Sequence, residues 1–110
     1  MDLELEVMEE GDKSKIIVSG EIDAYTAPKL KDALLPLTNK EGQTVEVNLE
    51  HVSYMDSTGL GVFISALKST KENSSHMKLV DLQERVYRLF NITGLIEIMD
   101  IKAVIRGGSE

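Results

Sequence analysis

Two kinds of apolar spacing alternate along this chain, and their order restricts the fold more than any other feature of the sequence. Leu3, Leu5 and Val7 are separated by acidic residues, which is the two-residue period of a strand with one buried face. Farther along, apolar residues recur at the three- and four-residue steps of an amphipathic helix, at Leu60, Phe63, Ile64 and Leu67. A chain that alternates between these patterns is expected to form a β-sheet with helices packed on it.

The complete pattern predicts one α/β domain with a mixed sheet and the element order ββαβαβαβ. Strands are expected at 3–7, 15–19, 44–49 and 77–80, with a short last strand within 96–101. Helices are expected from an N-cap at Thr26, after Asp56, and over 82–90 with Gly94 as the C-cap. Pro36 makes the first helix costly to continue past Leu35, although a final irregular turn to Thr38 is possible. The first two strands form a hairpin, 20–23 is a loop, and strands joined through a helix lie parallel with right-handed crossovers.

The length of 110 residues is that of a single domain. We place this domain at residues 1–103. The chain ends in Arg-Gly-Gly-Ser-Glu, and we expect residues 104–110 to form a flexible tail.

Composition excludes several classes of function. The net charge of −7 argues against binding to nucleic acid or to an anionic membrane. No apolar run approaches the roughly 20 residues that cross a bilayer, and the acidic, alternating start is unlike a signal peptide. The absence of cysteine excludes disulfides and thiolate metal sites and favours a cytoplasmic location. His51 and His76 lack ligand spacing, so no metal or cofactor is expected and both are predicted to be surface or loop-edge residues.

The segment Asp56-Ser57-Thr58-Gly59-Leu60-Gly61 stands where an apolar strand gives way to a striped helix. Unpaired backbone N–H groups and the helix dipole favour negative charge at such a start. Capping by Asp56 or Ser57 is the default role of these side chains. A serine here can also serve as a nucleophile or as a site of phosphate attachment.

Catalytic interpretations fit the segment poorly. A hydrolase nucleophile elbow has glycine on both sides of its serine, and here no base or orienting residue stands in a recognisable pattern. The aspartic-protease signature has one residue between Asp and Gly, whereas this chain has two. Gly59 and Gly61 lack the lysine or third glycine of a phosphate-binding loop. We expect Gly61 to allow close packing of the first helical turn, which would compensate its cost of about 1 kcal/mol in a helix.

Phosphate attachment remains compatible with capping. A phosphoserine carries about −1.5 to −2 charges at neutral pH, and a helix N-terminus tolerates such a group. An acidic or tightly packed partner surface would not tolerate the phosphate group. Phosphate on Ser57 could therefore abolish association while leaving the fold unchanged.

Residues 54–63, Tyr-Met-Asp-Ser-Thr-Gly-Leu-Gly-Val-Phe, closely resemble the phosphorylation segment of bacterial anti-sigma factor antagonists. These are small stand-alone domains of the sulfate-transporter and anti-sigma-antagonist (STAS) class. Residues 20–28 resemble the family's loop before its first helix, and 88–95 resemble its last helix and cap. The resemblance covers nearly the whole chain and is greater to the general stress-response branch than to the sporulation branch.

The resemblance implies a phosphorylation-switched binding module and not an enzyme. In this family the unphosphorylated antagonist binds an anti-sigma factor that is also a serine kinase, and so releases the sigma factor. The kinase uses ATP to phosphorylate the antagonist, which breaks the complex, and a metal-dependent serine phosphatase reverses the modification. Transferred to this chain, the acceptor is Ser57, with Thr58 as a less accessible alternative, and the domain acts as a monomer or weak dimer.

The expected partner interface combines this segment with the loop before the first helix: Asp23, Tyr25, Met55, Asp56, Ser57, Thr58, Gly59 and Leu60. Met55 and Leu60 could supply apolar contacts, although Leu60 begins the helical stripe and is better placed for the core. Two other functions stay open from the sequence: a STAS subunit of a larger stress-signalling scaffold or small-ligand sensor, and a weak nucleotide hydrolase.

Overall fold

The computed structural model of this chain describes residues 2–102, 104 and 105. The elements follow in the order β1 (Leu3–Glu10), β2 (Lys13–Ile22), α1 (Ala27–Thr38), β3 (Thr44–Met55), α2 (Ser57–Asn73), β4 (His76–Val80), β5 (Leu82–Gln83), α3 (Glu84–Ile92), the 3₁₀ turn η1 (Leu95–Glu97), β6 (Asp100–Ile101) and β7 (Val104–Ile105).

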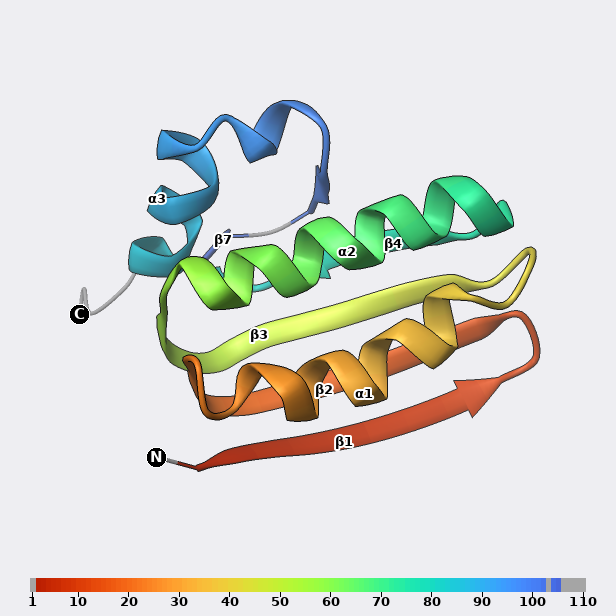
Figure 1. Cartoon of the computed structure of the whole chain (residues 1–110), viewed down its shortest axis with the longest axis horizontal. Helices are drawn as coiled ribbons and strands as arrows, with labels where there is room; N and C mark the ends of the chain where they lie inside the picture. Colours follow the sequence, from red (N-terminus) through yellow and green to blue (C-terminus); the bar gives the residue numbers. More distant parts are fainter. Residues whose placement is uncertain (1, 103, 106–110) are drawn as a thin grey trace.

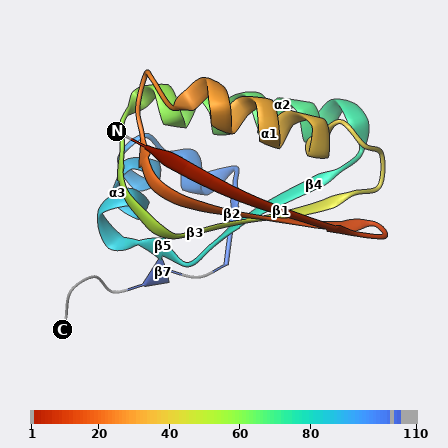
Figure 2. The ribbon, with the colours of Figure 1, turned by 90° about the horizontal axis from the view of Figure 1, so that it is seen from below.

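The main sheet has five strands in the order β1-β2-β3-β4-β6. β1 is antiparallel to β2, and the remaining neighbours are parallel. α1 and α2 lie side by side on one face of this sheet, and α3 lies at the end where α2 begins (Figures 1 and 2). The predicted mixed α/β fold is confirmed.

The core lies between the sheet and the two long helices. Its strand side chains include Ile16, Val18, Val47 and Leu79, all fully buried, and these residues alternate along their strands as the sequence predicts. The helices contribute Leu30, Leu34 and Phe63, which are also fully buried.

Several predicted strand ends are wrong because β1, β2 and β3 pair farther along the chain, to Glu10, Ile22 and Met55 instead of residues 7, 19 and 49. Residues 20–22 were expected in a loop, yet they belong to β2, where Glu21 and Ile22 pair with Tyr54 and Met55 of β3 across a register shift. Gly20 has φ +120°, and a Cβ there would lie 2.3 Å from the Asp2 carbonyl oxygen, so this close approach of β1 requires glycine.

The C-terminal prediction also needs correction. Leu82 was expected in a helix, but it forms β5, which pairs in parallel with Val104–Ile105 of β7. Residues 104 and 105 of the expected tail are therefore in a strand, and residues 106–110 lie outside the described residues. The strand expected within 96–101 is reduced to β6, because η1 occupies Leu95–Glu97.

α2 is rotated relative to its predicted orientation. Leu60 and Phe63 are buried as expected, but Ile64 is 37% exposed, and the buried set continues instead through Val62, Ala66, Ser69 and Thr70. α1 packs beside α2, and the Thr38 hydroxyl donates a hydrogen bond of 2.9 Å to the Ser69 hydroxyl between the helices. α2 thus packs against α1 as well as the sheet. The contact with α1 buries small and polar residues, which the spacing of apolar residues does not predict.

No helix within residues 2–102 and 104–105 combines the length and the apolar composition needed to cross a membrane.

Replacement of Phe63 by alanine should lower the free energy of unfolding by about 3–5 kcal/mol. Phe63 is fully buried and makes an edge contact with Phe90 of α3, with ring centroids 5.9 Å apart. The adjacent Ile64→Ala should cost less than about 1 kcal/mol, because Ile64 faces outward. Urea unfolding of both variants measures the difference, and similar losses would contradict the orientation of α2 described here.

Candidate functional site at the start of helix α2

The parallel pairing of β2 with β3 brings two loops together. Ile22 and Met55 are partners at the carboxyl ends of these strands, and the Asp56 N–H donates to the Ile22 carbonyl at 3.2 Å. The Asp23–Thr26 loop therefore lies beside the junction from β3 into α2, at the same end of the molecule (Figure 1). Such ends of parallel strands commonly carry binding sites in α/β proteins.

Asp56, and not Ser57, caps α2. Its backbone is extended (φ −113°, ψ −168°), and its Oδ1 accepts the Thr58 N–H at 3.0 Å. The same oxygen accepts the Thr58 hydroxyl, while the Asp56 carbonyl accepts the N–H groups of Gly59 and Leu60. Ser57 is thus the first residue of the helix, and one carboxylate satisfies both donors of Thr58.

Ser57 and Thr58 differ in hydrogen bonding. Both residues are exposed, so the position of Thr58 inside the helix does not bury it. The Thr58 hydroxyl donates to Asp56, whereas the Ser57 hydroxyl forms no hydrogen bond with any described residue. Of the two neighbouring hydroxyls, Ser57 is therefore the one whose proton and oxygen can both be reached from outside.

Three residues predicted at the partner interface lie beneath the surface. The side chains of Met55 and Leu60 are 4% and 6% exposed, and Gly59 is buried. A Cβ on Gly59 would stand 2.5 Å from Met55 Cγ and 2.8 Å from Ile22 Cγ2. These residues hold the start of α2 against the sheet, so they support the exposed positions and cannot themselves form most of a contact surface.

The expected reason for the second glycine of the motif is also wrong. A Cβ added to Gly61 would meet no atom within 4 Å, and the residue lies on the exposed side of α2. Close packing therefore explains Gly59 and does not explain Gly61.

Asp23 organises the neighbouring loop. Its Oδ1 accepts the N–H groups of Tyr25 at 2.9 Å and Thr26 at 3.0 Å. The pKa of the Asp23 carboxyl lies below its ordinary value of 3.8, chiefly because the Thr26 backbone N–H donates to the charged form. Thr26 occupies the N-cap position of α1 as predicted, but its hydroxyl donates to the Glu21 carbonyl at 2.7 Å instead of capping the helix.

The loop turns Tyr25 outward, with 90% of its surface exposed. The sequence patterns did not indicate the exposure of Tyr54, which is 48% exposed near the end of β3, or of Ile64, which lies on the exposed side of α2. Strand alternation before the buried Met55 could have indicated the outward direction of Tyr54. Tyr25 and Ile64 add exposed apolar surface to the loop and the helix that carry the site, whereas Tyr54 points to the side of β3 opposite Met55 and α2.

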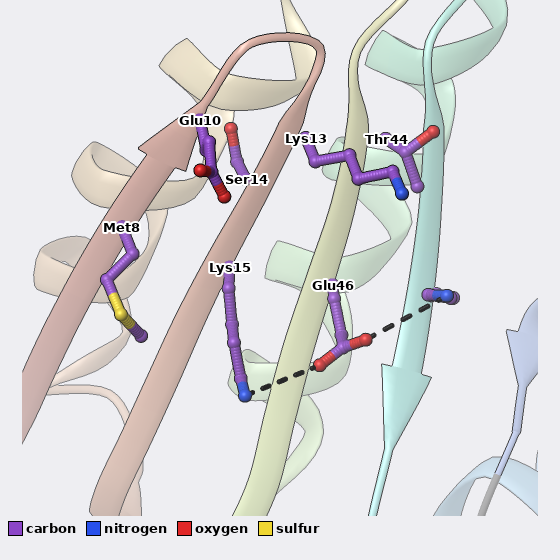
Figure 3. Close-up of a pocket in the computed structure, with 8 residues that line it drawn as sticks. Met8, Glu10, Lys13, Ser14, Lys15, Thr44 and Glu46 are labelled. Carbon is purple, nitrogen blue, oxygen red and sulfur yellow. Dashed lines mark ion pairs between the residues drawn. The ribbon is translucent and has the colours of Figure 1, made fainter.

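The other polar features of the described chain do not form a metal site. Residues 2–102 and 104–105 contain no group of His, Cys, Asp and Glu that could hold a metal ion. His51 and His76 are both exposed, as predicted. His76, at the start of β4, has its Nε2 atom 2.6 Å from the carboxylate of Asp100 in β6. A shallow hollow of about 340 Å³ lies on β1–β4, where Glu46 contacts Lys15 and Lys78 at 3.8 Å each (Figure 3). None of the residues that line this hollow belongs to the start of α2.

The STAS domain family model matches residues 5–107. The chain is 50% identical to the anti-sigma-B factor antagonist of Listeria monocytogenes over 105 residues, which cover 94% of this chain and 92% of that protein. It is 44% identical to the anti-sigma-B factor antagonist of Bacillus subtilis over 108 residues, 98% of each chain. The crystal structure of an anti-sigma factor antagonist from Mycobacterium paratuberculosis has the same fold, with a TM-score of 0.80 and 23% identity over 91% of this chain and 85% of that chain.

This chain belongs to the STAS domain family. The curated relatives that it matches at 40–50% identity are anti-sigma-B factor antagonists.

The Asp23 carboxylate should contribute a pH-dependent part of the stability. Because its folded pKa is depressed, the contribution is present above the ordinary pKa of 3.8 and is lost as the pH falls through the lower folded value. The stability difference between the wild type and Asp23→Asn should therefore be constant near neutral pH and should shrink under acid conditions. NMR titration of the wild type checks the cause, and an Asp23 pKa at or above 3.8 would contradict it.

Proposed function

We propose that this chain is an anti-sigma factor antagonist whose unphosphorylated form binds an anti-sigma factor serine kinase and thereby releases a sigma factor. Phosphorylation of Ser57 ends this binding. The near full-length identity to anti-sigma-B factor antagonists supports the role. The observation that carries the assignment of the site is the exposed Ser57 hydroxyl beside an Asp56 carboxylate that is already occupied by Thr58.

The hydrogen bonds favour Ser57 over Thr58 as the phosphate acceptor. A kinase must bring a base to the hydroxyl proton and a phosphoryl group to the oxygen. Asp56 already accepts the proton of Thr58, and a phosphate there would stand directly against the carboxylate and remove the helix cap. Ser57 carries neither obstacle.

The same geometry supports a switch that acts on binding and not on folding. A phosphate on Ser57 would extend outward from the first turn of α2, where the helix dipole favours negative charge. In a complex, the same group would add about −1.5 to −2 charges to a surface that already carries Asp56. Burying that charge without a compensating cation costs several kcal/mol, which lowers the affinity of a complex by orders of magnitude.

In this mechanism the chain is a regulatory protein and the partner performs the chemistry. The kinase supplies ATP and the catalytic base, a metal-dependent serine phosphatase restores the binding form, and all three act in the cytoplasm. The antagonist itself functions as a monomer or weak dimer without a cofactor.

The central test is incubation with the cognate kinase and ATP, followed by mapping of the phosphate by mass spectrometry. Phosphate is expected on Ser57 of the wild type and of Thr58→Val. Ser57→Ala should bind the kinase but accept no phosphate, and Ser57→Asp should bind at least tenfold more weakly. Phosphate at another residue, or wild-type affinity of Ser57→Asp, would refute the proposal.

A second test concerns the role of Asp56 in selecting the acceptor. Glycine at an N-cap costs only a few tenths of a kcal/mol relative to the usual caps, so Asp56→Gly removes the carboxylate with little loss of helix stability. In the Ser57→Ala background, Asp56→Gly should allow phosphorylation of Thr58, which the single Ser57→Ala variant should not show. Absence of phosphothreonine in a double variant that still binds the kinase would contradict this selection.

A further inference from the structure

Gly61 lies on an exposed strip of α2 that begins at Ser57. Residues Ser57, Gly61, Ile64 and Lys68 follow one another at steps of four, three and four, and all four are exposed. In an α-helix, Gly61 is about 6 Å along the axis from Ser57 and about 40° around it. A partner that covers Ser57 therefore also faces the position of Gly61.

Nothing within the described fold requires glycine at this position. Gly61 is not among the residues with positive φ, and a Cβ would enter open space. Gly59, two residues earlier, shows the opposite situation, because Met55 and Ile22 leave no room for a Cβ. Glycine is nevertheless an unfavourable residue inside a helix, where it exposes the backbone and loses more conformational entropy than alanine. A residue of low helix propensity inside a helix, with no close contact in the fold that requires it, is typical of a functional position.

We propose that Gly61 is the point where the anti-sigma factor kinase packs directly on the backbone of α2. The inference rests on the proposed function, because the kinase is the partner that the proposed function names. The missing side chain leaves a notch between Ser57 and Ile64, into which the partner inserts an apolar side chain. A Cβ at this position would hold the partner surface away from Ser57.

The neighbours of Gly61 determine the chemistry of the partner. The N–H and carbonyl of Gly61 belong to the hydrogen-bond ladder of α2, so the notch offers mainly CH₂ and backbone surface and little free hydrogen-bonding capacity. Ile64, 37% exposed, adds an apolar wall on the next turn. The notch is continuous with Ser57, and phosphoryl transfer requires the partner's ATP within about 3–3.5 Å of the Ser57 hydroxyl. The kinase that modifies Ser57 is thus the partner that must reach the notch.

Gly61→Ala tests this inference because stability and binding should change in opposite directions. The urea midpoint of the isolated protein should rise, since alanine is the better helix former and meets no neighbour. Affinity for the kinase should fall at least tenfold, and phosphorylation of Ser57 should slow. Gly61→Val, with a larger side chain, should bind more weakly still.

Ser65→Ala is the matched control. It also raises the helix propensity of α2. Ser65 stands one turn after Gly61, but its replacement removes an atom from the surface and adds none. It should bind the kinase like the wild type, which separates the effect of the added Cβ from that of a stiffer helix.

The outcomes separate the inference from the proposed function. Wild-type binding and Ser57 phosphorylation, together with wild-type affinity of Gly61→Ala, would overturn the role of Gly61 alone. Equal losses in Gly61→Ala and Ser65→Ala would also overturn it, because helix stiffness would then be the cause. A wild type that neither binds the kinase nor becomes phosphorylated would overturn both.

Discussion

The contact of Gly59 with Met55 and Ile22 is the constraint on which the functional end of this molecule depends. β2 and β3 finish beside each other, and α2 can begin there only because Gly59 carries no side chain. This contact sets the height of the first helical turn above the sheet. The positions of Asp56, Ser57 and Thr58 follow from it, since all three belong to the same turn.

The two aspartates at this end have structural roles that leave the serine available. Asp23 closes its loop through the N–H groups of Tyr25 and Thr26, and Asp56 caps α2 through Thr58. Each carboxylate is therefore engaged with its own chain. The Ser57 hydroxyl remains exposed above the buried residues Met55, Gly59 and Leu60. A charge added to this hydroxyl changes the surface without rearrangement of the core. That separation between a rigid frame and one modifiable atom suits a protein that is switched on and off by phosphorylation.

Gly59 and Gly61 illustrate how two identical residues in one motif can serve different purposes. The first is explained by atoms of this chain and the second is not. Stability alone would favour a side chain at residue 61, so the glycine is best understood through the surface that it presents. The site therefore extends beyond the six-residue motif along α2 and includes Tyr25 from the neighbouring loop.

Local patterns in the sequence determined the order of strands and helices, the hairpin at the start and the helix N-terminus at Asp56, because each depends on residues close together in the chain. Only the tertiary structure decided which residues of the motif are exposed. Ile64 faces outward because α1 occupies one flank of α2, and Met55 is buried because it pairs beside Ile22, 33 positions earlier in the chain. The extension of β2 and the pairing of β5 with β7 likewise depend on partners distant in sequence. The spacing of apolar residues predicts that an element has a buried face, whereas the tertiary structure determines which other element covers that face.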